Sequence, residues 1–451
     1  MRLGTVQQGH RWLRHTLAVT LVSALAAVSF SGCADAQEGR NTWVGTWATA
    51  PIVLPPPRDG VPQGLGGEPV RIQDQTVRQI VHTSIGGSVV RVTVSNFFGT
   101  DPLEVGAAHV ALRADGAGID AGTARPLLFG GQAAVTVEAG SMEVSDAVEL
   151  GVPALADLAV DLYLPGDSGA DISGATYHAA GLTTSYLSAT GDHTGAVELP
   201  VDGTYQSWFY LSRVDVMAPE GTAGIVTLGD SITDGTASTP DTNSRWPDFL
   251  ARRLMARAEH APVAVMNVGI AGNRVLSDNA GLGLFNQNPD APPPPPSNPN
   301  AQFGPSALSR FDRQVLQQQG VTHVIVLESI NDIGMAFESE SPTVEELIAG
   351  HTSMVERAHA QGLLIYGGTL TPFEGAFYFR DVGETKRQAF NEWIRTSGVY
   401  DAVIDFDAAV RDPDQPSRFQ EAYQSGDWLH PSDEGYRAMA QAIDLSLFDV
   451  Q

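Results

Sequence analysis

The chain has 451 residues, enough for about two or three domains, and its 43% hydrophobic content is typical of a globular protein with a sizeable core. Its formal net charge of -26 disfavours nucleic acid and anionic membrane surfaces as partners, because both attract basic patches. Cys33 is the single cysteine, which excludes an intramolecular disulfide, a cysteine-ligated zinc ion and a catalytic cysteine.

Residues 1–36 have the features of an export signal. Three arginines form a basic n-region, and the apolar stretch TLAVTLVSALAAVSF follows. Two processing sites compete: SFSGC resembles a bacterial lipobox ending in Cys33, whereas ADA before Gln37 resembles an ordinary cleavage site. We therefore expect an exported protein of bacterial type, either secreted or periplasmic, or anchored to the membrane by a lipid on Cys33.

Residues 41–217 are predicted to form a β domain. In SVVRVTVSN, the residues Val90, Val92 and Val94 alternate with polar residues, which is the period-two pattern of a strand. LAVDLYL and QAAVTVEA show similar patterns, and clusters of Gly, Pro and Asp separate the apolar runs. Many short strands with frequent turns favour an all-β sandwich of jelly-roll-like type.

Strands and helices alternate over residues 222–448. The predicted strands are 224–230, 261–269, 321–329, 363–369 and 400–406. The predicted helices are 245–259, 306–319, 343–362, 384–395 and 432–443. Apolar strands joined by helical crossovers indicate a parallel sheet covered on both faces, that is, a three-layer α/β/α domain.

A proline-rich insert interrupts this domain at residues 277–305. It contains the run NPDAPPPPPSNPN, which favours polyproline II over packed structure. We expect a surface insert, and its place just after a candidate oxyanion loop also suggests a rim of the active site.

Polar residues follow four of the predicted strands. In an open parallel sheet, ligands bind at the edge where the carboxyl ends of the strands lie, so these residues are candidates for a functional site. They are Gly229, Asp230 and Ser231; Gly269, Gly272 and Asn273; Ser329, Asn331 and Asp332; and Asp427 and His430.

These residue types suit nucleophilic catalysis. Ser231 needs a base to take its proton, and His430 can serve while Asp427 holds the other ring nitrogen. The tetrahedral intermediate needs preorganised donors. The backbone N–H groups of Ser231 and Gly272 and the side-chain amide of Asn331 are the predicted oxyanion hole. Asp230 and Asp332 are predicted to hold turns, Asp234 to cap the next turn, and Asn273 to hold a turn or contact substrate.

The four blocks GDSITDG, NVGIAGN, SINDIG and DWLH resemble those of the SGNH, or GDSL-type, hydrolase superfamily. The resemblance covers about residues 222–448 and implies a flavodoxin-like hydrolase domain with Ser231 as nucleophile, His430 as base, Asp427 as its partner, and Gly272 and Asn331 in the oxyanion hole. Ser329 departs from the glycine that is usual in the third block. The start of the β region, WVGTWATAP, is similar to that of two-domain extracellular esterases, including xylanase-associated acylesterases.

We therefore predict a carboxylic ester hydrolase without cofactor or metal, acting on short acyl groups such as acetyl on a small-molecule or polysaccharide ester. A lipase- or phospholipase-type acylhydrolase is the first alternative. The second is a carbohydrate-binding protein with a vestigial hydrolase domain, in which the aromatic cluster of QSWFYLS (206–212) would stack on sugars instead of packing against the hydrolase domain.

Overall fold

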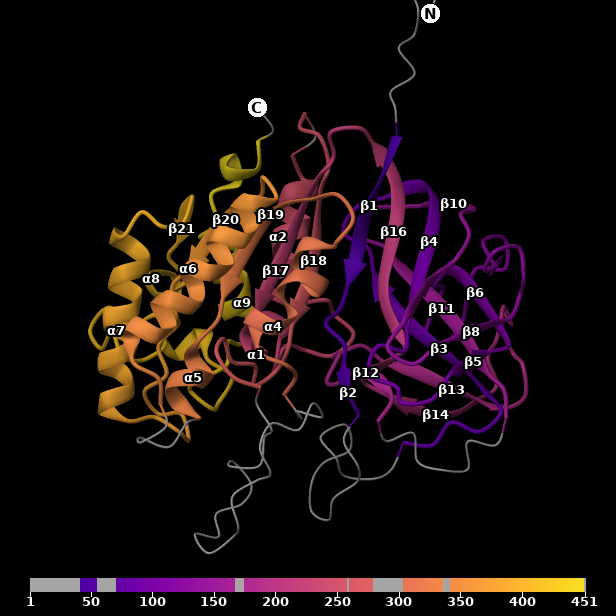
Figure 1. The fold of residues 1–451 in the computed structure, drawn as a ribbon, viewed down its shortest axis with the longest axis horizontal. Helices are drawn as coiled ribbons and strands as arrows, with labels where there is room; N and C mark the ends of the chain where they lie inside the picture. The colour runs from indigo at the N-terminus through magenta and orange to yellow at the C-terminus, as the bar shows by residue number, and fades with distance from the viewer. Residues whose placement is uncertain are drawn as a thin grey trace, which may run out of the picture. The chain divides into compact units, whose positions relative to one another are not determined.

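The computed structural model describes residues 41–54, 70–166, 174–257, 259–278, 303–335 and 341–449 (Figure 1). The predicted export signal, Cys33 and most of the proline-rich insert therefore lie outside the described residues. Contacts between residues join 40–451 into one unit. Among the described residues, none of the helices combines the length and apolar character that a membrane crossing requires.

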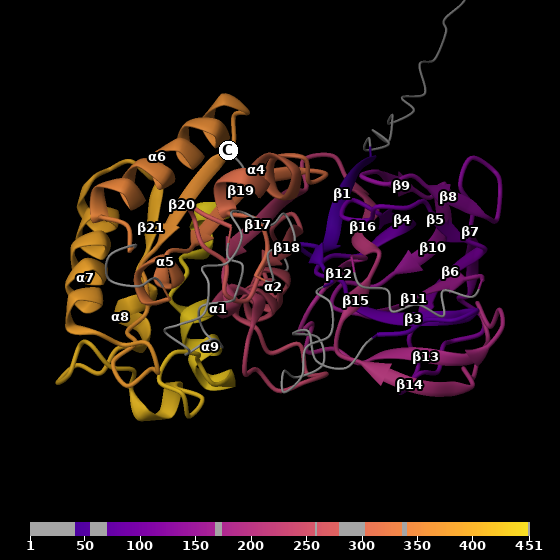
Figure 2. The same cartoon turned by 60° about the horizontal axis from the view of Figure 1, so that its bottom comes forward.

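The N-terminal region consists of antiparallel sheets and is the expected β domain (Figures 1 and 2). One sheet has the order β1-β16-β4-β10 with β9 on β4, and a six-stranded sheet has the order β14-β13-β3-β11-β6-β7. Smaller sheets join β15, β12 and β2, and β5 to β8. The strands are β1 (Asn41–Ala48), β2 (Ile52–Val53), β3 (Gln75–His82), β4 (Gly87–Ser95), β5 (Leu103–Val105), β6 (Ala107–Leu112), β7 (Arg125–Leu127), β8 (Val135–Val137), β9 (Met142–Val144), β10 (Val148–Val152), β11 (Asp157–Leu164), β12 (Thr176–His178), β13 (Ser185–Thr190), β14 (Val201–Tyr205), β15 (Trp208–Phe209) and β16 (Leu211–Pro219).

The two larger sheets share one hydrophobic core. The valines that alternate along β4, Val90, Val92 and Val94, are fully buried in it. Val77 on β3 and Leu162 on β11 belong to the other sheet and lie in the same core. The period-two pattern therefore identified the inward-facing residues of β4.

The C-terminal region contains a parallel five-stranded sheet with the order β18-β17-β19-β20-β21. In chain order this is 2-1-3-4-5, the strand order of flavodoxin-like folds, as predicted. The strands are β17 (Ala223–Gly229), β18 (Val263–Gly269), β19 (Val321–Leu327), β20 (Leu364–Gly368) and β21 (Ala402–Ile404).

Helices cover both faces of this sheet (Figure 2). In one layer α4 contacts α6, and α6 contacts α7; in the other α2 contacts α9, and α9 contacts α8. The helices are α1 (Ser231–Asp234), α2 (Trp246–Met255), α4 (Ala307–Phe311), α5 (Ile330–Gly334), α6 (Val344–Ala360), α7 (Asp381–Thr396), α8 (Phe406–Val410) and α9 (Asp433–Gln441). A π-helical segment, Asp312–Leu316, extends α4, and short 3-10 turns are Glu421–Tyr423 and Leu445–Phe448.

The β region meets the α/β region along β1 and β18, which lie side by side in both views (Figures 1 and 2). The N–H of Gly45 donates to the carbonyl of Gln319 at 2.9 Å. The approach at Gly45 is close, because a Cβ there would lie 2.3 Å from the sulfur of Met266, whose side chain would have to move. The N–H of Val265 donates to Oγ of Ser84 at 3.0 Å, a second buried link between the regions.

The aromatic residues of QSWFYLS are buried in this arrangement. Trp208, Phe209 and Tyr210 are 5%, 1% and 7% exposed. Trp208 packs edge-on against Trp47, and the guanidinium of Arg245 from the α/β region lies over its ring. These rings therefore have no open face for stacking on a sugar, and the packing interpretation is correct.

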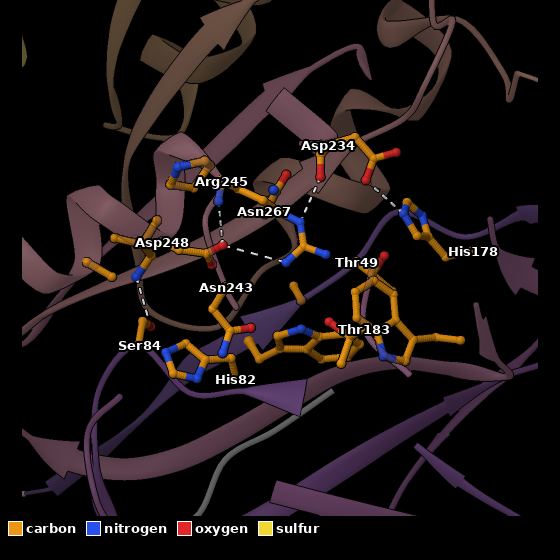
Figure 3. Close-up of a pocket in the computed structure, with 16 residues that line it drawn as sticks. Thr49, His82, Ser84, His178, Thr183, Asp234, Asn243, Arg245, Asp248 and Asn267 are labelled. Atoms are coloured by element: carbon orange, nitrogen blue, oxygen red, sulfur yellow. Dashed lines mark hydrogen bonds and ion pairs between the residues drawn. The ribbon is translucent and has the colours of Figure 1, made fainter. Parts of the chain in front are cut away.

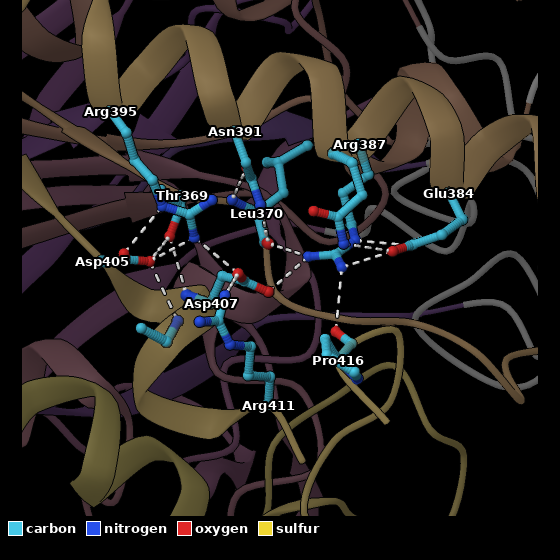
Figure 4. A network of polar contacts seen from close by, with 12 residues as sticks. Thr369, Leu370, Glu384, Arg387, Asn391, Arg395, Asp405, Asp407, Arg411 and Pro416 are labelled. Atoms are coloured by element: carbon cyan, nitrogen blue, oxygen red, sulfur yellow. Dashed lines mark hydrogen bonds and ion pairs between the residues drawn. The ribbon is translucent and has the colours of Figure 1, made fainter. Parts of the chain in front are cut away.

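A network of charges fixes α7 to the end of β20 (Figure 4). Arg387 is fully buried and bonds to Asp407 at 2.6 Å, to Glu384 at 2.7 Å and to the carbonyl of Leu370 at 2.8 Å. The amide of Asn391, also on α7, donates to the same carbonyl. Because each buried charge has a partner, the network anchors the segment after Leu370, which leads to the site.

Candidate active site

The structure brings the predicted serine, histidine and aspartate together at the carboxyl edge of the parallel sheet. Ser231 begins α1 directly after β17, and His430 and Asp427 lie in the segment before α9. Nε2 of His430 is 2.8 Å from Oγ of Ser231, and Nδ1 is 2.6 Å from Oδ2 of Asp427. Residues almost two hundred positions apart in the sequence therefore form one hydrogen-bonded chain.

Asp427 is held in place by its own loop. Its Oδ1 accepts hydrogen bonds from the backbone N–H groups of Leu429 and His430, each at 2.9 Å. Burial alone would raise the pKa of Asp427, but the hydrogen bond and charge of His430 and these N–H groups hold it well below its ordinary value. The carboxylate is therefore ionised and accepts a hydrogen bond from the Nδ1–H group of His430, which leaves Nε2 to accept a hydrogen bond from Ser231.

The turn at Ser231 has strict steric requirements. Asp230 caps α1, since its Oδ1 accepts from the N–H of Ile232 at 2.9 Å. A Cβ at Gly229 would lie 2.2 Å from Oγ1 of Thr233, and Gly235 ends the turn with a φ of 102°. The predicted turn role of Asp230 is confirmed. The strand ends at GDS because Gly229 leaves room for the turn and Asp230 caps the helix that begins at Ser231.

Hydrogen bonds tie the two other predicted loops to each other. The amide Nδ2 of Asn331 on α5 donates to the carbonyl of Asn273 at 3.0 Å, and the hydroxyl of Tyr378 donates to Oδ1 of Asn331 at 3.4 Å. Gly272 has a φ of 75°, and a Cβ there would lie 2.6 Å from the ring of Phe303. Glycine at 272 is thus required both by its left-handed backbone and by this close approach.

Asn273 and Asp332 have structural roles. Asn273 is fully buried, donates to the carbonyls of Phe303 and Pro305, and accepts from Arg310. This arrangement supports its turn role over substrate contact. Asp332 accepts from the N–H groups of Val275 and Leu276, as expected of a residue that holds a turn.

The predicted role of Asp234 is wrong. Its side chain does not cap the following turn: Oδ1 lies 3.0 Å from Nε2 of His178, and Oδ2 accepts from the N–H of Ala271 at 3.0 Å. His178 belongs to β12 of the β region, so no local sequence pattern could have indicated this pair.

Charged residues that sequence analysis missed lie directly beneath the serine turn. Glu328 and Arg310 are fully buried, as is Asp230. Burial raises the pKa of Asp230 to about 6 and that of Glu328 well above its ordinary value, and burial lowers the pKa of Arg310 to about 10. Glu328 ends an apolar strand, which hides it among residues that are expected to be core.

A second serine–histidine pair exists, but it is internal. Ser329 has a φ of 111°, and its Oγ lies 2.9 Å from Nε2 of His351, whose Nδ1 contacts the hydroxyl of Tyr400. Ser329 and His351 are 0% and 1% exposed, and burial lowers the pKa of His351 to about 3. This neutral histidine holds the backbone at the position where the third block departs from glycine.

Among the described residues, no cluster of three or more His, Cys, Asp or Glu side chains is arranged to hold a metal ion. The hydrogen-bonded chain from Ser231 through His430 to Asp427 can perform the chemistry of an activated serine.

The model of the GDSL-like lipase/acylhydrolase family matches residues 227–438. A search of the curated proteins finds no match. Among solved structures, an acetyl xylan esterase from Geobacillus stearothermophilus is 18% identical with a TM-score of 0.34, covering 49% of this chain and 91% of that chain. A GDSL-like lipase from Bacteroides thetaiotaomicron is 17% identical with a TM-score of 0.34, covering 50% of this chain and 87% of that chain.

The family match begins at Thr227, two residues before Gly229, and contains all four predicted blocks in full. It includes Ser231, Asn331 and His430. Residues 227–438 are a domain of the GDSL-like lipase/acylhydrolase family, and the protein is in the carboxylic ester hydrolase class.

Proposed function

We propose that the protein is an exported serine esterase that cleaves carboxylic esters through an acyl-enzyme. The observation that carries this proposal is the hydrogen-bonded chain from Ser231 through His430 to Asp427, with distances of 2.8 Å and 2.6 Å. Ser231 is 6% exposed and the side chain of His430 is 13% exposed, whereas the other serine–histidine pair is sealed inside the domain. The pair of Ser231 and His430 is therefore the more exposed of the two.

Ser231 is the nucleophile and His430 is the general base. As Oγ attacks the ester carbonyl, its proton passes to Nε2 of His430, and Asp427 stabilises the imidazolium through Nδ1. The imidazolium then gives this proton to the departing alcohol, which leaves the acyl group on Ser231. Water attacks the acyl-enzyme with His430 again as base, and the acid is released.

The oxyanion of each tetrahedral intermediate is stabilised by the N–H groups of Ser231 and Gly272 and by Nδ2 of Asn331. The bond from Nδ2 to the carbonyl of Asn273 occupies one amide hydrogen and fixes the direction of the other. Tyr378 assists by engaging the amide oxygen, so that the amide presents its nitrogen to the site. Donors fixed before the reaction need no reorganisation as charge develops.

Short acyl groups, such as acetyl on carbohydrate, are the proposed substrates. The support is the similarity of the opening WVGTWATAP and the β region to xylanase-associated acylesterases. Rates on p-nitrophenyl esters from acetate to palmitate, followed by acetyl release from acetylated xylan, test this choice. A maximum at long chains would instead assign the lipase-type activity.

Export is proposed from the basic and apolar stretches of residues 1–36. The mass of the protein recovered from its native host tests it. A chain beginning at Gln37 indicates ordinary secretion, a lipid-modified chain beginning at Cys33 indicates an anchor, and an unprocessed chain argues against export.

The nucleophile is tested with Ser231→Ala on p-nitrophenyl acetate. We expect the parent to turn over and the variant to fall by at least about 10³-fold in kcat. Ser238→Ala is the matched control, because Ser238 is also buried and lies just after α1 but outside the hydrogen-bonded chain. Equal turnover by Ser231→Ala and the parent would refute the nucleophile, whereas no turnover by either protein would favour a vestigial domain.

A further inference from the structure

Asp234 uses each of its carboxylate oxygens to hold a different part of the protein. It ends α1, the short helix that begins at Ser231. Oδ2 accepts from the N–H of Ala271, the residue before Gly272, and Oδ1 accepts from Nε2 of His178 in the β region, both at 3.0 Å. One buried carboxylate thus joins the nucleophile turn, the oxyanion loop and the β region.

His178 is fixed in a single orientation. Its Nδ1 lies 2.9 Å from the carbonyl of Ala50, which follows β1, and its side chain is 3% exposed. The ring of Trp208 packs against it, with the centroids 5.5 Å apart. Each ring nitrogen lies within hydrogen-bond distance of an oxygen: Nδ1 faces a backbone carbonyl and Nε2 faces the carboxylate of Asp234. A donor from the β region is therefore aimed at Asp234 without freedom to rotate.

A second contact, made by Arg245, also ties Asp234 to the β region. A pocket at the junction of the two regions is lined by His178, Trp208, Asp234 and Arg245, with Arg245 and His178 approaching Asp234 from different directions (Figure 3). Nε of Arg245 donates to the backbone carbonyl of Asp234 at 2.8 Å, while another nitrogen of the guanidinium bonds to the carbonyl of Gly181 in the β region. Both the backbone and the side chain of Asp234 are thus tied to the β region.

We propose that His178 is a positioning residue of the esterase: through Asp234 it holds the N–H of Ala271, and with it the oxyanion loop, in register with Ser231. This rests on the proposed function. The β region is then a part of the catalytic unit, and its removal disorders the oxyanion hole as well as the domain junction.

Loss of the bond from His178 to Asp234 should lower kcat, because the oxyanion develops only as Ser231 attacks and is not present in the bound ester. Without a donor from His178, Asp234 is a buried carboxylate that lacks one partner, and α1 and the loop at Ala271 shift to compensate. Donors in such a site must lie about 2.7–3.1 Å from the oxyanion, and a displacement of about 1 Å costs on the order of 100-fold in rate. Substrate binding does not use this geometry, so KM stays near its parental value.

Two substitutions separate the two bonds of His178. In His178→Gln the side-chain nitrogen can occupy the place of Nε2 and donate to Asp234. In His178→Asn the shorter amide can replace Nδ1 and donate to the carbonyl of Ala50 but does not reach Asp234. Ser84→Ala is the matched control, because it removes a buried bond between the regions, to the N–H of Val265, without touching Asp234.

We expect kcat on p-nitrophenyl acetate to fall by about 10- to 100-fold in His178→Asn and by no more than about threefold in His178→Gln, with KM unchanged. All three variants lower the unfolding temperature, and Ser84→Ala keeps the parental kcat. Hydrogen exchange of the peptide that contains Ala271 rises in His178→Asn but not in Ser84→Ala.

Parental exchange at Ala271 in His178→Asn would overturn the inference, as would an equal loss of kcat in His178→Asn and Ser84→Ala. The exchange measurement needs no turnover. A failure of the proposed esterase function would be seen separately, as equal turnover by Ser231→Ala and the parent.

Discussion

Glu328 is buried against another carboxyl group, and we predict that replacing it with glutamine stabilises the protein at alkaline pH. Among the described residues, no N–H or O–H group of a neighbour donates to Oε1 of Glu328. The side chain of Glu328 instead shares a hydrogen bond with the carboxyl group of Asp230. Two carboxyl groups bond to each other only if one of them is protonated. Asp230 accepts from the N–H of Ile232 at 2.9 Å, whereas Oε2 of Glu328 accepts from Ser329 at 3.2 Å, so the proton belongs on Glu328.

The magnitude follows from proton linkage. Burial, then the charges of Asp230 and Asp332, raise the pKa of Glu328 well above 4.5 in the folded state. Its contribution is fully present below the unfolded pKa and is lost as pH rises towards the folded pKa, because the unfolded chain releases the proton first. Each pH unit costs about 1.4 kcal/mol for one proton, so the interval from pH 6 to pH 8 costs up to about 3 kcal/mol. Glutamine keeps the donor to Asp230 and has no proton to lose.

Urea unfolding of the parent and Glu328→Gln at pH 5, 6, 7 and 8 tests this. The variant should equal the parent near pH 5 and gain on it steadily as pH rises. Glu384→Gln is the matched control, because Glu384 forms an ion pair with Arg387 and the same substitution should destabilise there. A difference between Glu328→Gln and the parent that stays constant with pH would refute the neutral Glu328, and so would a variant that is less stable at pH 8.

Two further predictions concern the hydrogen-bonded pairs of the site. Asp427→Asn should lower kcat on p-nitrophenyl acetate by about 10³- to 10⁴-fold with KM unchanged, because an amide donor at Nδ1 forces the proton onto Nε2; a loss below about tenfold would argue against the role of Asp427. Ser329→Ala should lose about 1–3 kcal/mol of stability in urea unfolding because it leaves Nε2 of His351 without its partner. Ser329→Gly should lose roughly 1 kcal/mol less than Ser329→Ala, since glycine adopts a φ of 111° without backbone strain. A larger loss for Ser329→Gly than for Ser329→Ala would contradict the presence of backbone strain at this residue.

The positions of the candidate catalytic residues could be predicted because two simple rules combine. Apolar runs such as 321–329 mark buried parallel strands, and parallel topology gathers the residues after these strands at one edge. That reasoning brought Ser231 to His430 without any knowledge of the strand order. The short helices α1 and α5 escaped prediction, because four or five residues are too few to show helical periodicity.

The supporting residues could not be predicted in the same way. Glu328 follows four apolar residues and carries no local sign of its pairing, since only the packing of Asp230 against it creates the shared proton. His178 stood among several histidines of the β region, and its partner Asp234 lies 56 residues away in a different fold type. Contacts of this kind arise from tertiary packing, which neither periodicity nor motif spacing encodes.

The junction of the two regions explains why such contacts form at all. Gly45 lets β1 approach so closely that a methyl group would meet Met266, and a Cβ at Gly320 would lie 2.9 Å from Val44. The interface between the two regions is therefore as closely packed as a domain core. Independent modules are expected to have a more polar and more loosely packed contact. The carbonyl of Ala50, just after β1, contacts Nδ1 of His178. The position of β1 therefore also helps to fix the position of His178 relative to Asp234. The fit of β1 to β18 and the contact of His178 with Asp234 therefore belong to one interface, but of the two only the contact with Asp234 reaches the oxyanion loop, through the N–H of Ala271.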